Sequence, residues 1–332
     1  MYNASERWTV FYELIAGKAK SLIDPATGSI DGRYTELVNC PVCKSSSNEP
    51  YIIKDGFTYV KCRVCDFIYS NPQLTWEAIE KGYNDIEVRS YFLNELLIPF
   101  VEPGQQKGFQ ERLNRISLLL TSKTRRLLDI GCAAGNFLKI AGEMGFDAEG
   151  LELDDINVRY AKEKRSLNAH MNTLDEMEYP ESTFDVVTLW DVLEHLSEPM
   201  QTLREVSRVM RRGGIIGIST INHACANQKI LKAQWRYWMP PDHICSFTPP
   251  ILRKMLKEAG FTVISEEHTY MFEVLEEQKL HFLLFSSKKD PISRLSNRIK
   301  KIAYVALAKT TQAIFGAMKS GDIITVLARK IE

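Results

Sequence analysis

Residues Arg125–Leu138 read RRLLDIGCAAGNFL, an apolar strand that breaks into a glycine-containing turn and then opens a helix. Gly131 and Gly135 have no Cβ, so the turn can approach a ligand closely, and the new helix offers unpaired N–H groups. The G-x-x-x-G spacing differs from the G-x-G-x-x-G of dinucleotide-binding turns. Asp129 precedes the first glycine, where a carboxylate repels a pyrophosphate but attracts an ammonium group. The turn therefore predicts a nucleoside with an amino-acid tail as ligand.

A second acidic residue follows at a distance typical of nucleotide-binding folds. Residues 147–154 read as a second strand, and Glu152 lies 21 residues after Gly131. This spacing is near the ~20-residue offset of the carboxylate that binds ribose hydroxyls in α/β folds. We therefore expect Glu152 to bind the ribose of the ligand.

Together these residues resemble motif I and the strand-two acid of class I S-adenosylmethionine-dependent methyltransferases. The resemblance continues through residues 184–196, FDVVTLWDVLEHL, and 203–214, LREVSRVMRRGG, and it spans about 125 to 270. It implies a Rossmann-like α/β fold with a doubly wound, mostly parallel seven-stranded sheet, and S-adenosyl-L-methionine as the methyl donor. The cofactor-binding residues that it implies are Asp129, Gly131, Cys132, Gly135, Asn136, Glu152, Leu153 and Trp190.

Strand-like and helix-like segments alternate after residue 125, which also favours a parallel sheet covered on both faces. Ligands of such sheets bind at the carboxyl ends of the strands. We therefore expect cofactor and chemistry to meet at that edge. The expected strands are 127–130, 147–153, 184–190, 215–220, 260–264 and 322–328.

Four of the seven cysteines form two C-x-x-C pairs separated by 18 residues. The spacing matches the C-x₂-C…C-x₂-C zinc pattern, and four thiolates complete a closed tetrahedron, so the predicted zinc ion is structural. The segments on either side of Asp55-Gly56 read as a hairpin between the pairs, which makes a small zinc ribbon. Disulfides or chance turns are the alternative. The predicted ligands are Cys40, Cys43, Cys62 and Cys65.

Composition restricts the partners and the location. The chain has 332 residues, 45% of them hydrophobic, and a formal net charge of zero. No overall field attracts nucleic acid, which is therefore disfavoured as a partner. The N-terminus lacks a signal sequence, and no run approaches the ~20 apolar residues that span a bilayer, so we expect a cytoplasmic protein.

We expect four units along the chain: an N-terminal helical segment (1–36), the zinc ribbon (37–72), a helical linker or cap (73–123) and the methyltransferase domain (124–332). In the last unit, residues 221–250 form an aromatic and proline-rich insertion on the substrate side. A helical insertion, 273–321, precedes the last strand. Its basic and apolar residues at 298–315 could contact a membrane surface or another subunit, although packing on its own domain is the commoner role. The oligomeric state stays open.

Methyl transfer from a sulfonium needs no acid, because the departing thioether is neutral. The enzyme aligns the acceptor and, for a hydroxyl or carbon acid, removes a proton. His195 after the fourth strand is the first candidate base, and His243 in the aromatic insertion is the second. Asp191, Glu194 and His195 also resemble the E-x-x-E-H metal motif of some quinone and RNA O-methyltransferases. Asp191 departs from its first Glu, and Glu198 stands where a second His would follow.

These features predict a methyltransferase that O- or C-methylates a small-molecule or sugar/glycan-linked acceptor. The end of strand four lacks the N-P-P-Y-type motif of amino-group methyltransferases that act on nucleic-acid bases. One alternative is an RNA-directed O-methyltransferase. The other is a non-catalytic partner-binding protein on a vestigial scaffold, against which the intact Asp129, Gly131 and Glu152 argue. The zinc-ribbon build resembles enzymes of bacterial sugar, polysaccharide or secondary-metabolite pathways by analogy of fold alone.

Overall fold

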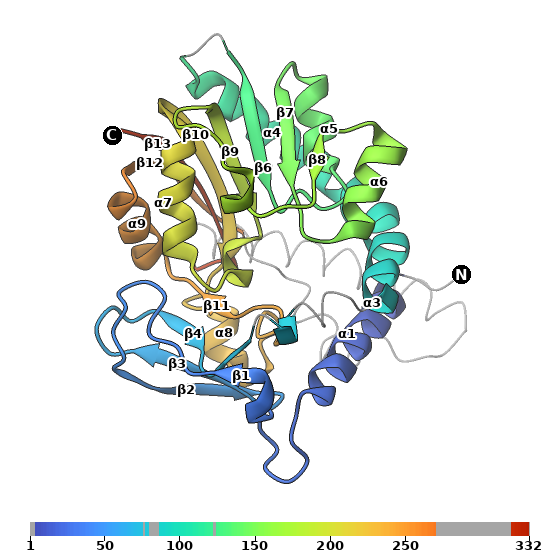
Figure 1. Cartoon of the computed structure of the whole chain (residues 1–332), viewed down its shortest axis with the longest axis vertical. Coiled ribbons are helices and arrows are strands. Elements are labelled where there is room, and N and C mark those ends of the chain that lie inside the picture. The colour runs from blue at the N-terminus through green and yellow to red at the C-terminus, as the bar shows by residue number, and fades with distance from the viewer. Residues whose placement is uncertain (1–3, 76, 80–85, 122–123, 270–319, 332) are drawn as a thin grey trace, which may run out of the picture.

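The computed structural model describes residues 4–75, 77–79, 86–121, 124–269 and 320–331 (Figure 1). Apart from its last two residues, the helical insertion expected at 273–321 lies outside these ranges, and so does its basic segment at 298–315. Among the described helices, none combines the length and the apolar character needed to cross a membrane.

A seven-stranded sheet forms the centre of the upper half of the molecule in Figure 1, in the order β12-β13-β10-β9-β6-β7-β8. All neighbouring strands are parallel except β13, which runs antiparallel to β10 and β12. The mostly parallel, Rossmann-like sheet predicted from the sequence is thus confirmed. The strands are β6 (Arg126–Ile130), β7 (Asp147–Leu151), β8 (Ala169–His170), β9 (Phe184–Trp190), β10 (Met210–Ile221), β12 (Phe261–Thr269) and β13 (Ile323–Lys330).

Helices cover both faces of this sheet. Two apolar clusters pack these helices on the sheet. One cluster joins the sheet to α7 and α9, and the other joins it to α4, α5 and α6. Every residue of β9, at the middle of the sheet, is buried. The covering helices are α4 (Glu102–Leu119), α5 (Asn136–Glu143), α6 (Asp155–Arg165), α7 (Pro199–Val209) and α9 (Pro249–Glu258).

A second sheet holds the cysteine region and draws one strand from the methyltransferase sequence. Its order is β11-β4-β3-β2, formed by β2 (Asn48–Lys54), β3 (Phe57–Cys62), β4 (Ile68–Ser70) and β11 (Cys245–Ser246). β2 and β3 are the expected hairpin, whereas β11 comes from the 221–250 insertion. The Ser70 amide donates to the Ile244 carbonyl (2.8 Å), and the ring of Phe67 packs on that of Phe247. The ribbon and the insertion therefore form one packed unit.

The N-terminal segment packs on the helices that precede the large sheet. Helix α1 (Ala4–Ser21) packs through Phe11 and Ile15 on Leu96 of a π-helix, Phe92–Val101, which continues α3 (Ile86–Tyr91) and runs into α4. A 3₁₀ turn, Gly32–Tyr34, follows α1, and β1 (Thr35–Glu36) pairs with β5 (Gln73–Leu74). In the insertion, α8 (Ala226–Leu231) and a 3₁₀ turn, Lys232–Gln234, follow β10. Figure 1 places α1 beside the ribbon, below the sheet.

Candidate functional site

The glycine turn lies at the carboxyl end of β6. Gly131 (φ 70°) and Gly135 (φ 82°) occupy the left-handed region, where a side chain would be strained. A Cβ at Gly131 would lie 2.5 Å from Cγ2 of Val192, and a Cβ at Gly135 would lie 2.4 Å from Cδ1 of Leu167. Both positions therefore require glycine. Helix α5 begins at the next residue, Asn136, so its first amides face this turn.

Asp129 is a buried carboxyl directly before this turn. Its side chain is 2% exposed, and its Oδ1 accepts a hydrogen bond from the Thr188 hydroxyl on β9 (2.6 Å). Burial raises the pKa of Asp129 to about 7, although the Thr188 bond lowers it. A bound ammonium group would favour the ionised form, since an opposite charge replaces the lost water.

Glu152, just after the end of β7, closes the other side of the turn. Its Oε2 accepts the amide of Ala133 (2.9 Å), and its Oε1 accepts the amides of Leu153 (2.7 Å) and Asp154 (3.0 Å). Burial raises its pKa, and these three bonds oppose the rise. The side chain of Leu153 is 41% exposed beside it. The structure thus brings together the strand-two acid and the glycine turn, as their expected roles require.

The remaining expected cofactor residues test whether the site suits a nucleoside. The buried Asn136 Nδ2 and Trp190 Nε1 find no hydrogen-bond partner among the described residues, which leaves two donors for a ligand. The Trp190 ring itself packs in the core, 5.5 Å from the Phe137 ring and under the Arg112 guanidinium. Cys132 is buried where a Cβ on Gly150 would contact its Sγ at 2.6 Å. Two acids, a glycine turn and unused donors fit a nucleoside with an amino-acid tail.

His195 and His243, 48 residues apart, meet beyond the end of β9. His195 lies in a 3₁₀ turn, Leu193–His195, and its Nδ1 is 2.8 Å from the carbonyl of Asp242. His243 Nδ1 is 2.9 Å from the carbonyl of Tyr237, and the two imidazole centroids are 4.8 Å apart. A carbonyl only accepts, so each Nδ1 carries the hydrogen and each Nε2 keeps its lone pair.

The two histidines differ in burial, and this affects how well each could act as a base. His243 is 7% exposed, and burial together with the nearby His195 lowers its pKa to about 3. His195 is half-buried, and its pKa is lowered mainly by burial, so its imidazole is neutral at pH 7. His195 also lines a cavity of about 660 Å³. Of the pair, His195 is the better placed to accept a proton.

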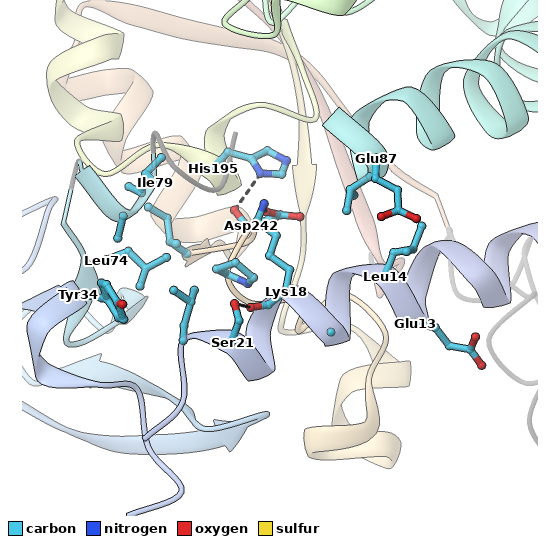
Figure 2. A pocket seen from close by; sticks show the side chains of 16 residues that line it. Glu13, Leu14, Lys18, Ser21, Tyr34, Leu74, Ile79, Glu87, His195 and Asp242 are labelled. Atoms are coloured by element: carbon cyan, nitrogen blue, oxygen red, sulfur yellow. Dashed lines mark hydrogen bonds and ion pairs between the residues drawn. The ribbon is translucent and has the colours of Figure 1, made fainter. Parts of the chain in front are cut away.

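The cavity beside His195 is the part of the site that the sequence analysis missed. Its other walls are α1, the β1–β5 region, α3 and the loop at Pro241–Ile244 (Figure 2). The α1 residues that line it recur with the spacing of one helical face, which is the only sign of this wall in the sequence. The residue types at 1–36 indicate no chemistry. The α1 residues that line the cavity are Glu13, Leu14, Gly17, Lys18, Ser21 and Leu22.

Glu194 adds a carboxyl group beside the histidines. It is 1% exposed, and its Oε2 accepts the Thr220 hydroxyl (2.8 Å). Burial, and then the charge of Asp191, raises the pKa of Glu194 to about 8. One possible ligand atom from each of Glu194, His195 and His243 lies within 4.8 Å of the others. Asp191 accepts the Ser219 hydroxyl instead (2.8 Å).

The four expected zinc ligands also converge. Sγ of Cys40 is 3.5 Å from that of Cys65, Sγ of Cys43 is 3.5 Å from that of Cys62, and all four lie within 4.8 Å of one another. A tetrahedron with Zn–S bonds of ~2.3 Å needs sulfurs about 3.8 Å apart, so the four positions fit such an ion. All four are free thiols, which disagrees with the disulfide alternative.

Known proteins resemble the sheet domain of this chain. A family model described as a methyltransferase domain matches residues 104–266. A ubiquinone biosynthesis O-methyltransferase of Psychrobacter arcticus is 25% identical over 51% of this chain and 72% of that protein. A protein of the same name from Saccharophagus degradans is 32% identical over 33% of this chain and 50% of its own length. A SAM-dependent methyltransferase structure from Archaeoglobus fulgidus aligns over 71% of this chain and 100% of its own, with 19% identity and a TM-score of 0.48.

Proposed function

We propose that this chain, which belongs to the class I S-adenosylmethionine-dependent methyltransferases, transfers the methyl group to a hydroxyl of a small molecule. The relatives named as O-methyltransferases of ubiquinone biosynthesis support transfer to oxygen and a small acceptor. The observation that carries the proposal is the place of His195, a neutral imidazole that follows β9 at the carboxyl edge of the sheet and lines a cavity.

Contacts across the turn support this placement of His195. The Gly131 backbone lies against the side chain of Val192, and the Val192 carbonyl accepts the amide of His195 (3.0 Å). The candidate base therefore lies one packed residue from the cofactor turn, at the carboxyl edge of the sheet. The sequence predicts chemistry at the same edge.

Each of the site residues has a distinct role in this proposal. Asp129 binds the ammonium group of the cofactor, Glu152 accepts the ribose hydroxyls, and the turn at Gly131 and Gly135 lets the cofactor approach the backbone. S-adenosylmethionine, when bound, supplies an electrophilic methyl group on a sulfonium. His195 holds its Nδ1 hydrogen on the Asp242 carbonyl and accepts the acceptor's hydroxyl proton at Nε2.

The four ribbon cysteines, in this proposal, hold one structural zinc ion. Their thiolates would fill all four positions of a tetrahedron, so the ion would take no part in methyl transfer. Its contribution would be to fold the ribbon, whose small sheet buries little apolar surface by itself.

A divalent metal ion held by Glu194, His195 and His243 is a second candidate mechanism, favoured by one observation. Both histidines donate Nδ1–H to a backbone carbonyl, which is the arrangement that orients a metal-binding imidazole. The sequence resemblance lacked a second histidine, and His243 supplies one through space. In this case His195 would bind the metal ion and would not act as the base.

The direct test is transfer of labelled methyl from S-adenosylmethionine to a small-molecule extract freed of protein and nucleic acid. We expect label in a methyl ether, and we expect His195→Ala to lower the rate by ~10²–10⁴-fold with cofactor affinity nearly unchanged. His243→Ala is the matched comparison and should lower the rate less, because His243 is buried away from the cavity.

Three outcomes would change the assignment. Label only in a glycan or RNA fraction would replace the small-molecule acceptor. Wild-type turnover in His195→Ala would remove the base. A loss in chelated wild-type enzyme that added Mg²⁺ or Mn²⁺ restores, with equal losses in His195→Ala and His243→Ala, would support the metal mechanism.

A further inference from the structure

The cavity at His195 has walls of contrasting character, and these restrict what it can bind. Figure 2 shows Tyr34, Leu74 and Ile79 at one end, with His195 and Asp242 in the middle. Leu14 of α1 and Val88 of α3 add apolar surface at the other end. A volume of about 660 Å³ lies in the usual range for small-molecule sites, ~300–1,000 Å³.

The charged lining groups are mostly acidic. Among the described residues that line the cavity, there are three carboxylates, Glu13, Glu87 and Asp242, and one ammonium group, that of Lys18. Lys18 Nζ is 3.7 Å from Asp242 Oδ1, so its charge is matched by the carboxylate beside His195. Glu13 and Glu87 lie at the α1–α3 end (Figure 2). The described lining therefore has two more carboxylates than cations, and it would repel a negatively charged ligand.

We propose that this cavity is the acceptor site and that it accepts a hydroxyl compound with an apolar body and no negative charge, with a cationic group favoured near Glu87. The proposal rests on the function proposed above, because only a hydroxyl next to His195 Nε2 could be methylated there. The same lining disfavours anionic acceptors, including phosphorylated sugars and nucleotides. The N-terminal helix α1 thereby becomes a specificity element.

The chain offers a matched pair of substitutions for the test. Gly17 lies in α1 and lines the cavity, and a Cβ built on it meets nothing within 4 Å, so Gly17→Leu can start a side chain there without a clash at Cβ. Gly108 in α4 is also exposed, helical and free of neighbours at its Cβ, but it does not line the cavity. Both substitutions replace a helical glycine with a better helix former, so neither should lower stability.

The probes are three ring compounds that differ in charge: catechol, dopamine and 3,4-dihydroxybenzoate. Calorimetry with the full-length chain, saturated with S-adenosylmethionine, should show catechol and dopamine binding, and the anionic probe binding roughly tenfold more weakly than dopamine. Gly17→Leu should weaken the binding of both probes, because its side chain takes up part of the cavity, while Gly108→Leu should leave it unchanged. Glu87→Gln should reduce the preference for dopamine over 3,4-dihydroxybenzoate. Glu111 is a carboxylate of α4 outside the cavity, so Glu111→Gln should leave this preference unchanged.

Failure of this proposal can be told apart from failure of the proposed function. If Gly17→Leu binds the probes as wild type does, or if the benzoate binds as tightly as dopamine, the acceptor site is elsewhere. Absence of catechol and dopamine binding also overturns the proposed ligand class. The function itself fails only if wild-type protein transfers no labelled methyl to the small-molecule extract. Transfer that persists in Gly17→Leu would leave the function intact and refute the cavity.

Discussion

Asp129 is the residue whose chemistry depends most on what it binds. Burial raises the pKa of its carboxyl to about 7, so the protonated form is well populated near neutral pH. Only the carboxylate attracts an ammonium group, and the ammonium in turn lowers the carboxyl pKa. Cofactor binding should therefore release a proton below pH 7.

This linkage gives a pH dependence of definite sign. As pH falls from 7 to 5, the affinity for S-adenosylmethionine should fall by up to about tenfold per pH unit, because the proton must leave before the ammonium binds. Calorimetry between pH 5 and pH 7 measures it. Asp129→Asn should bind weakly at every pH. A wild-type affinity that is level across this range would contradict the role of Asp129.

The sequence predicts the two acids of the cofactor site but not their neighbours. Asp129 and Glu152 were predicted because their chain positions relative to Gly131 carry information. Thr188, which binds Asp129, and Val192, which packs on Gly131, were not predicted, because they meet the turn only through strand pairing. His195 and His243 were each predicted as bases, but nothing in the chain order showed that their rings would meet.

Among the elements, β11 has a consequence for the zinc ribbon. This strand begins two residues after His243 and pairs with β4 of the ribbon, and the hydroxyl of Tyr59 on β3 donates to the His243 carbonyl (2.6 Å). Cys40 and Cys62 also share one apolar cluster with α7 and α9. The ribbon therefore supports the loop that carries His243 and Asp242, and Asp242 orients His195.

Loss of the zinc ligands should then affect more than the ribbon. Elemental analysis should find about one zinc per chain in the wild type and none in the Cys62→Ser, Cys65→Ser double variant. The double variant should unfold at a lower temperature, because the metal supplies folding energy to a small sheet. Cys225→Ser, a buried cysteine outside the cluster, should keep its zinc. A zinc-free wild type would show that the ribbon needs no metal ion.

The Tyr59 contact can be tested without removing a zinc ligand. Tyr59→Phe leaves the buried His243 carbonyl without this donor, and we expect a loss of ~1–3 kcal/mol in the free energy of unfolding with the zinc content unchanged. Tyr51→Phe, on the neighbouring strand and 39% exposed, should cost less. Denaturant unfolding of the two variants compares them. Equal, negligible losses would mean that the ribbon does not support the loop through this bond.

Element prediction was weakest for short or irregular segments. β8 has two residues, too few for a hydrophobic pattern, so the sequence reading did not find it. The π-helix Phe92–Val101 lies within the helical segment expected at 73–123, and although Pro99 inside it indicates an irregular helix, the sequence does not specify a π-helix. β11 could not be recognised either, since its partner strand lies more than 170 residues earlier.

At the scale of the whole molecule, the family resemblance predicts the architecture of the sheet, but it does not predict which acceptor the protein takes. The family resemblance implied a mostly parallel seven-stranded sheet, and this is confirmed, whereas the strand order and the antiparallel place of β13 were not predicted. The shared cavity of α1 and His195 could be recognised only in the folded structure, because residues 13–22 and 195 are far apart in the chain. In our proposal, acceptor choice therefore depends on contacts between elements, where a linear pattern carries little information.

The most direct test of the central claim is the affinity of Glu152→Ala for S-adenosylmethionine, measured by calorimetry beside wild type and Glu163→Ala, an exposed acid on α6. Removing the Glu152 carboxylate leaves the ribose hydroxyls without their acceptor, so binding should weaken by ~1–3 kcal/mol, about 5- to 150-fold. Glu163→Ala should bind as wild type does. Unchanged affinity in Glu152→Ala would contradict the cofactor site described here, and with it the assignment of a methyl-transfer site to this edge of the sheet.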